Sequence, residues 1–92
     1  MSDIKLSQEL GRAAEAQEIL SNPIFADAIE KLKLAYTDAW LNSPARDEEG
    51  REKIYQFMQA LKSVEEHLVS VVQTGELAKA QLDELRTRKR LI

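Results

Sequence analysis

The stretch FMQALKSVEEHLVSVVQTGELAKAQLDEL, from Phe57 to Leu85, decides the fold of this chain. Its apolar residues recur at alternating steps of four and three, which place them on one face of an α-helix. The series runs without a miss through Phe57, Leu61, Val64, Leu68, Val71, Gly75, Ala78, Leu82 and Leu85, and Ile54, Met58 and Val72 broaden it. The pattern therefore predicts one amphipathic helix.

Gly75 is the point at which that helix is most open to question. Taken locally, Thr74-Gly75 is typical of a helix C-terminal cap, but a break would shift the phase of the apolar series and no shift occurs. A glycine within a helix costs only about 1 kcal/mol relative to alanine. We expect one long helix from about Asp47 to Arg88, roughly 60 Å at 1.5 Å per residue, with a bend at Gly75 left open.

A second helix is predicted before it, from Pro23 to about Asn42. Asn22 is suited to accept a hydrogen bond from a free backbone N–H, and Pro23 loses nothing at the first helical position. One face carries Phe25, Ile29, Leu32, Tyr36 and Ala39, and Trp40 widens it. Two neighbouring apolar helices joined by a short connection pack antiparallel.

The connection lies in AWLNSPARDEEGRE, from Ala39 to Glu52. Pro44 biases Ser43 away from helical geometry, so the helix should stop there. Asp47 is a good N-cap, and the two glutamates after it complement the helix dipole. Ser43 capping with Pro44 at the first position is an alternative, earlier start. The charges and turn residues of this stretch are thus explained by capping, and Trp40 is expected to pack near Ile54 or Phe57.

The N-terminal segment from about Ser7 to Leu20 is a weaker amphipathic pattern, with Leu6, Leu10, Ala13 and Leu20 near one face. Gly11 weakens it, and the other alanines add propensity rather than packing. The predicted fold is all-α: an antiparallel helical hairpin with a short N-terminal helix and a long C-terminal helix, in an oligomeric bundle. Within one domain (1–92) we expect a weakly ordered N-terminal helix (1–21), the hairpin (22–85) and a basic tail (86–92).

Composition limits the classes of protein that fit. A chain of 92 residues buries only about 60–65% of its unfolded surface, so its stability is marginal without help. The absence of cysteine excludes disulfides and thiolate metal sites, and one histidine disfavours a zinc site. Oligomerisation is the remaining source of stability. With no signal-peptide pattern and no apolar run of membrane-spanning length, we expect a cytoplasmic protein without membrane contact.

No motif for catalysis, metal binding or cofactor binding is present. His67, beside Glu65 and Glu66, lacks the second histidine that a helical metal site needs, so we interpret it as an ordinary surface residue. The serines and threonines have no base implied by a motif. The aromatic residues Trp40, Tyr36 and Phe57 are interpreted as core rather than as a ligand pocket. The sequence predicts no enzyme and no cofactor.

Charge is distributed unevenly along the chain. The net charge is −3, yet the residues from Glu76 onward carry +2. The basic residues Arg86, Arg88, Lys89 and Arg90 stand at a helix C-terminus, where cations complement the dipole. An acidic protein partner and the phosphates of a nucleic acid are the alternatives, and neither is favoured.

The long helix is twice the length of the helix predicted to pair with it. The apolar stripe on its C-terminal half therefore requires another partner, such as a second copy or another protein. The predicted interface residues are Leu68, Val71, Val72, Leu82 and Leu85.

Two stretches carry a resemblance to a known group of proteins. EILSNPIFADAIEKLKLAYTDAWLNSPARDEEGREKIY, from Glu18, and EEHLVSVVQTGELAKAQL, from Glu65, are similar to short helical proteins encoded by tailed bacteriophages and prophages. The resemblance spans about Glu18 to Leu82 and includes Asn22-Pro23, Ala39-Trp40, Ser43-Pro44 and Thr74-Gly75.

What the resemblance implies is an accessory role in virion morphogenesis or DNA packaging, with phage structural or packaging proteins as partners and no catalytic residues to transfer. The expected function is that of a non-enzymatic assembly or adaptor protein in head morphogenesis or DNA packaging, located in the host cytoplasm or on the virion. A nucleic-acid-binding accessory that uses the basic end is the alternative.

Overall fold

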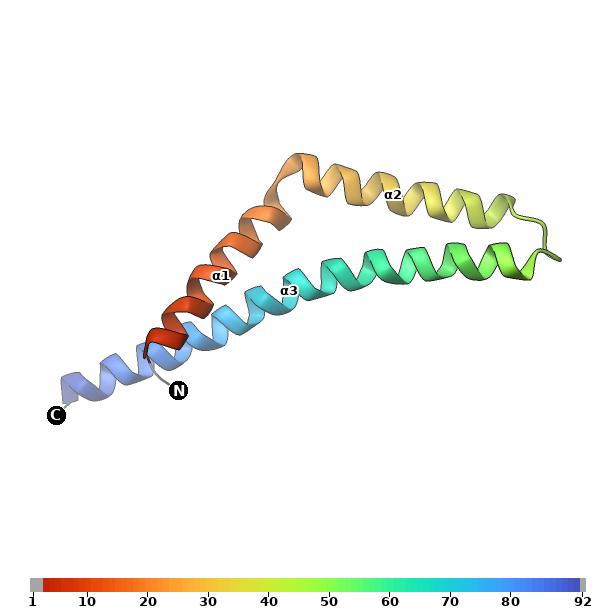
Figure 1. The fold of residues 1–92 in the computed structure, drawn as a ribbon. Helices are drawn as coiled ribbons and strands as arrows, with labels where there is room; N and C mark the ends of the chain where they lie inside the picture. The colour runs from red at the N-terminus through yellow and green to blue at the C-terminus, as the bar shows by residue number, and fades with distance from the viewer. Residues whose placement is uncertain (1–2, 92) are drawn as a thin grey trace. The chain divides into compact units, whose positions relative to one another are not determined.

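The computed structural model describes residues 3–91 and contains three α-helices within that range (Figure 1). They are α1 (Asp3–Ser21), α2 (Pro23–Asn42) and α3 (Glu48–Leu91). No strand occurs among the described residues. The all-α prediction, with a short N-terminal helix and a long C-terminal helix, is confirmed. None of the helices in the described range is long and apolar enough to cross a membrane.

The start of α2 has the predicted cap. The Asn22 side-chain oxygen accepts hydrogen bonds from the backbone N–H groups of Ile24, at 2.9 Å, and Phe25, at 3.1 Å. Pro23 occupies the first turn, where its missing N–H leaves no bond unmade. At the other end of α2, the Ser43 N–H donates to the Trp40 carbonyl at 3.2 Å. The backbone of Ser43 is extended, as expected for a residue before proline.

The start of α3 resolves the two alternatives left open by the sequence. The Asp47 N–H donates to the Pro44 carbonyl at 3.0 Å, which closes a turn. The Asp47 carboxylate then accepts the Gly50 N–H at 3.1 Å, so Asp47 is the N-cap and the earlier start at Ser43 is not used. Glu48 and Glu49 occupy the first turn, where the helix dipole favours carboxylates.

The third helix is continuous through Gly75 and spans 44 residues. It extends beyond the predicted end at Arg88 to Leu91, so residues 86–91 form its last turns. Ile92, the last residue of the predicted tail, lies outside the described residues. The unbroken apolar periodicity therefore predicted the helix correctly. The local pattern at Thr74-Gly75, which is typical of a helix C-terminal cap, does not end the helix.

The chain divides into two compact units. One, here called the α1 unit, comprises the residues up to Leu20 together with those from His67 onward. The other, the hairpin unit, is Ser21–Glu66 and contains α2 and the first part of α3. Each unit is described separately below.

The core of the α1 unit is small and tightly packed. Leu6 is 1% exposed and clusters with Ala78 and Leu82, while Leu10 and Leu85 pack against the cluster. At Gly75 the two helices approach closely. A Cβ built there would lie far inside van der Waals contact with the Ala13 Cβ and 3.3 Å from the Glu9 carbonyl oxygen.

This packing corrects one premise of the sequence analysis. The C-terminal half of the long helix was expected to lack a partner within the chain, and this is wrong because α1 covers it. Ala16, expected to add only helix propensity, is buried as well. Alanine and glycine were undervalued because a small side chain permits close packing without adding to an apolar pattern.

The hairpin unit is held by contacts between larger side chains. The rings of Tyr36 and Phe57 stack with centroids 5.8 Å apart and planes inclined by 20°. Lys33 pairs with Glu65 at 2.8 Å. Among the described residues of this unit, Ile29 is the only hydrophobic one that is buried.

Candidate functional site

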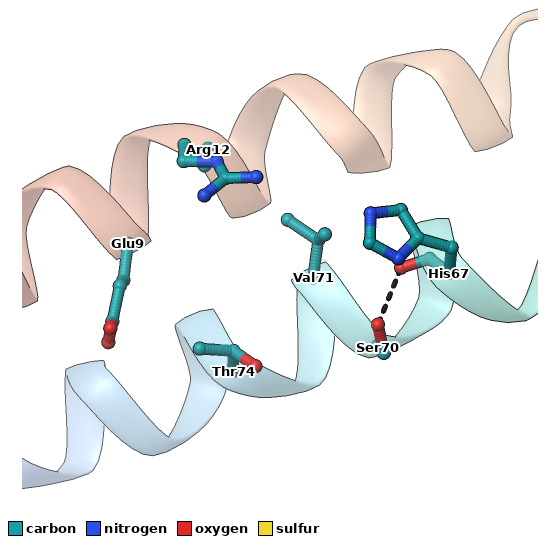
Figure 2. A pocket seen from close by; sticks show the side chains of 6 residues that line it. All are labelled: Glu9, Arg12, His67, Ser70, Val71 and Thr74. Carbon is teal, nitrogen blue, oxygen red and sulfur yellow. Dashed lines mark hydrogen bonds between the residues drawn. The ribbon is translucent and has the colours of Figure 1, made fainter.

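A polar hollow in the α1 unit is the first candidate site (Figure 2). Glu9 and Arg12 reach into it from α1, and the residues contributed by α3 are His67, Ser70, Val71 and Thr74. Its volume of about 230 Å³ is below the roughly 300–1,000 Å³ of most small-molecule sites.

The hydrogen bonding in this hollow does not form a catalytic pair. The Ser70 hydroxyl donates to the His67 backbone carbonyl at 2.7 Å, a bond within α3 that leaves the imidazole uninvolved. A nucleophilic serine would instead donate to the imidazole nitrogen. No group of three or more potential metal ligands occurs among the described residues, and no buried polar residue does either. The Ser70 hydroxyl and the His67 imidazole of this hollow are therefore not joined as a nucleophile and its base.

The hairpin turn forms a second polar cluster, centred on Arg51. The Arg51 guanidinium lies 4.2 Å from the centroid of the Trp40 ring. It also donates to the Ser43 hydroxyl at 2.9 Å and to the Ser43 carbonyl at 3.4 Å. The expected packing of Trp40 near Ile54 or Phe57 stays a prediction, since the ring contact that the structure gives is with Arg51. The cluster fastens the turn by joining the end of α2 to the start of α3.

The basic end of α3 is partly engaged within the chain. Arg88 pairs with Glu84 at 2.6 Å, and Lys89 lies 3.9 Å from the Asp3 carboxylate. Arg88, Lys89 and Arg90 stand in the last turn, where the helix dipole favours cations. These contacts account for part of the basic cluster without a nucleic acid.

The hairpin unit exposes an apolar surface along one side, here called the apolar face. On α2 it consists of Ala28, Leu32, Ala35 and Ala39, and on α3 of Phe57, Ala60 and Val64, all of them exposed. A rotation of about 100° per residue places these positions on the flank of each helix, beside the buried contact line. The Tyr36–Phe57 stack joins the two flanks on this side.

The opposite side of the hairpin unit carries both polar and apolar groups. It carries the Lys33–Glu65 ion pair and a hollow lined by Thr37, Gln59 and Lys62 as well as Met58 and Leu61. The two sides therefore differ in chemistry although the same two helices form both. The apolar face gathers Leu32, Phe57 and Val64 among alanines, so it is the side suited to a packing partner.

The five predicted interface residues fall in different surroundings. Leu82 is buried beneath α1 and Leu85 packs against the same cluster, so α1 already occupies the surface that was assigned to another chain. Leu68, Val71 and Val72 are half-buried. As an oligomer interface, the five residues remain a prediction.

The apolar face was missed because Leu32, Ala39, Phe57 and Val64 were assigned to the inner stripes of the hairpin. Phe57 and Val64 are 56% and 50% exposed, and the half-buried positions of α3 in this unit are instead Gly50, Arg51, Ile54, Met58, Leu61 and Glu65. A signal was present, since Ala28, Leu32, Ala35 and Ala39 also step by four, three and four. Alanine carries too little weight in a hydrophobic pattern to reveal it.

Comparison with known proteins identifies no relative: no protein family, no curated protein and no solved structure matches the chain.

Proposed function

We propose that this chain is a non-enzymatic helical assembly or adaptor protein that acts by associating with further copies of itself. Its setting, on the resemblance of residues 18–82 to phage and prophage proteins, is head morphogenesis or DNA packaging. It works in the host cytoplasm or on the virion, with phage structural or packaging proteins as its other partners.

The observation that carries this proposal is the exposure of large hydrophobic side chains in the hairpin unit. Eight are exposed there: Ile24, Leu32, Leu34, Trp40, Leu41, Tyr55, Phe57 and Val64. Single exposed hydrophobics are ordinary, but Leu32, Phe57 and Val64 share the apolar face with four alanines, and a contiguous patch of this kind marks an interaction surface. With one buried hydrophobic residue among its described positions, the hairpin unit gains most from being covered.

Light scattering of the purified protein tests the self-association. At tens of micromolar we expect a mass that is a multiple of 10.5 kDa, with a helical circular dichroism spectrum. A helical monomer of 10.5 kDa at that concentration would contradict the proposal. Co-purification with capsid, portal or terminase proteins from infected cells tests the phage setting separately.

The second candidate function is a nucleic-acid-binding accessory that uses Arg86, Arg88, Lys89 and Arg90. The clustering of four cations within five residues supports it. It requires DNA binding that weakens steeply with salt, because each phosphate contact releases counterions. Binding that survives replacement of these four residues by glutamine, or no binding at low ionic strength, would refute it.

A further inference from the structure

We propose that the apolar face of the hairpin unit packs against the same face of a second copy, related by a two-fold axis perpendicular to the helices. In this arrangement α2 lies antiparallel to α2 of the second copy, and α3 lies antiparallel to α3. The inference rests on the proposed self-association and names the surface that performs it.

The first argument is the self-complementary spacing of residues along α2. Leu32 and Ala35 are symmetric about a point between residues 33 and 34, and so are Ala28 and Ala39. Antiparallel pairing about that point places Leu32 of one copy opposite Ala35 of the other, and Ala28 opposite Ala39. Large side chains opposite small ones allow helices to interdigitate at close range. The side chain of Leu32, 41% exposed in the single chain, would then be covered.

The second argument is that α3 has a matching centre. Phe57 and Val64 are symmetric about a point between residues 60 and 61, and Ala60 stands beside that point. Antiparallel pairing therefore places Phe57 of one copy opposite Val64 of the other. The small side chain of Ala60 would lie near the two-fold axis, where it faces Ala60 of the second copy.

The third argument is that the two centres lie at the same level of the hairpin. The Tyr36–Phe57 stack and the Ser43–Arg51 hydrogen bonds fix how α2 and α3 are aligned. Counted from either of these contacts, the point between residues 33 and 34 of α2 lies level with the centre on α3 to within one residue. The Lys33–Glu65 ion pair, made by two long side chains, is offset from this alignment by about four residues. A single two-fold axis can therefore relate α2 to its counterpart and α3 to its counterpart at once. Binding of an unrelated partner would not require the two centres to lie at one level.

Charge at the rim agrees with the same axis. Lys31 and Asp38 border the apolar face on the outer edge of α2, and they are symmetric about a point one residue from the α2 centre. In the paired arrangement Lys31 of one copy lies near Asp38 of the other, and the reverse pair forms as well. Lys31, already paired with Asp27 within the chain, is exposed enough to serve both carboxylates.

Paired substitutions on α2 test the proposal. Ala35→Glu places a carboxylate on the apolar face at an exposed helix position, so it should leave the fold intact and halve the mass measured by light scattering. Leu32→Glu should do the same. Leu34→Glu, on the other side of the same helix, is the matched control and should leave the mass unchanged. Circular dichroism of each variant verifies that the helices persist.

Disulfide cross-linking tests the arrangement without disturbing association, because the chain contains no cysteine. Ala60→Cys should cross-link to itself on oxidation. The Ala28→Cys variant and the Ala39→Cys variant should each form no disulfide-linked dimer when oxidised alone. A mixture of the two variants should form a disulfide-linked dimer that contains one copy of each. Self-linking of Ala39→Cys, or no link at Ala60→Cys, would overturn the antiparallel two-fold.

The outcomes separate this inference from the proposed function. A wild-type monomer would overturn both. A wild-type oligomer whose mass is unchanged by Ala35→Glu and Leu32→Glu would overturn the apolar face alone, and self-association through another surface would stand.

Discussion

The α1 unit and the hairpin unit bury their apolar side chains to very different extents. Five of the six buried hydrophobic residues found in the described part of the chain belong to the α1 unit, and one, Ile29, belongs to the hairpin unit. The exposed large hydrophobics are distributed the other way, with eight in the hairpin unit and four in the α1 unit.

The residues at each helix contact explain this difference. In the α1 unit, Gly75 and Ala13 meet at the contact, so the two backbones approach closely and larger neighbours such as Leu6 are enclosed. In the hairpin unit the contact is made by two aromatic rings and a lysine–glutamate pair. Bulky and charged side chains hold helices apart and leave their flanks in solvent. Small residues at a crossing can therefore create more burial than large ones.

The largest expected effect comes from Leu6→Ala in the α1 unit. Removing a fully buried leucine side chain leaves a cavity and should cost about 2–5 kcal/mol of unfolding free energy. Leu34→Ala in the hairpin unit, at an exposed position, should stay within about 0.5 kcal/mol. Urea unfolding monitored by circular dichroism, at one fixed protein concentration, measures both. If the two substitutions lowered the free energy of unfolding equally, the α1 unit and the hairpin unit would not differ in how much their leucine side chains contribute to stability.

The two glycines of the α1 unit sharpen the comparison. Substitution by alanine should lower the free energy of unfolding at Gly75 and raise it at Gly11. Gly75→Ala gains about 1 kcal/mol of helix propensity, but its methyl group meets Ala13, and overpacking costs roughly 1–3 kcal/mol. We expect a net loss of about 1 kcal/mol. Gly11→Ala has open space around it and should gain up to about 1 kcal/mol. Thermal unfolding of both variants measures the signs, and a stabilising Gly75→Ala would show that α1 does not approach α3 closely.

Arg51→Lys should weaken the hairpin turn by about 1 kcal/mol. An ammonium group keeps the charge but cannot lie flat over Trp40 while it donates to both Ser43 oxygens. Hydrogen exchange at the backbone amides of Asp47 and Gly50 should increase in this variant. Arg46→Lys, in the same turn, is the control. Identical exchange in the two variants would show that the arginine cluster does not hold the turn.

Lys33→Gln should have the smallest effect, within about 0.5 kcal/mol. Its partner is Glu65, and the lysine side chain is more than half exposed, so solvent screens the pair. The loss should vanish in 1 M salt, where the Debye length is about 3 Å. A cost above about 1 kcal/mol that persists in high salt would mean that this contact contributes to the hairpin unit as packing does in the α1 unit.

Local chemistry along the chain determined where the helices begin and end. Asn22 before Pro23, Ser43 before Pro44, and Asp47 before two glutamates each set a boundary through hydrogen bonds to residues two to four positions away. The unbroken apolar phase likewise determined that α3 passes through Gly75. Such signals are readable because donor, acceptor and backbone bias all lie within one turn.

Only the tertiary structure decided which helix covers which part of the apolar series. Periodicity states that Phe57 and Leu82 share a face of α3, but it does not state what lies over each. The answer depended on Gly75 and Ala13, because their lack of bulk admits α1 at the C-terminal end, whereas the Tyr36–Phe57 stack leaves Phe57 and Val64 exposed in the hairpin unit. A small residue adds nothing to a hydrophobic pattern, and its effect appears only when a second helix approaches.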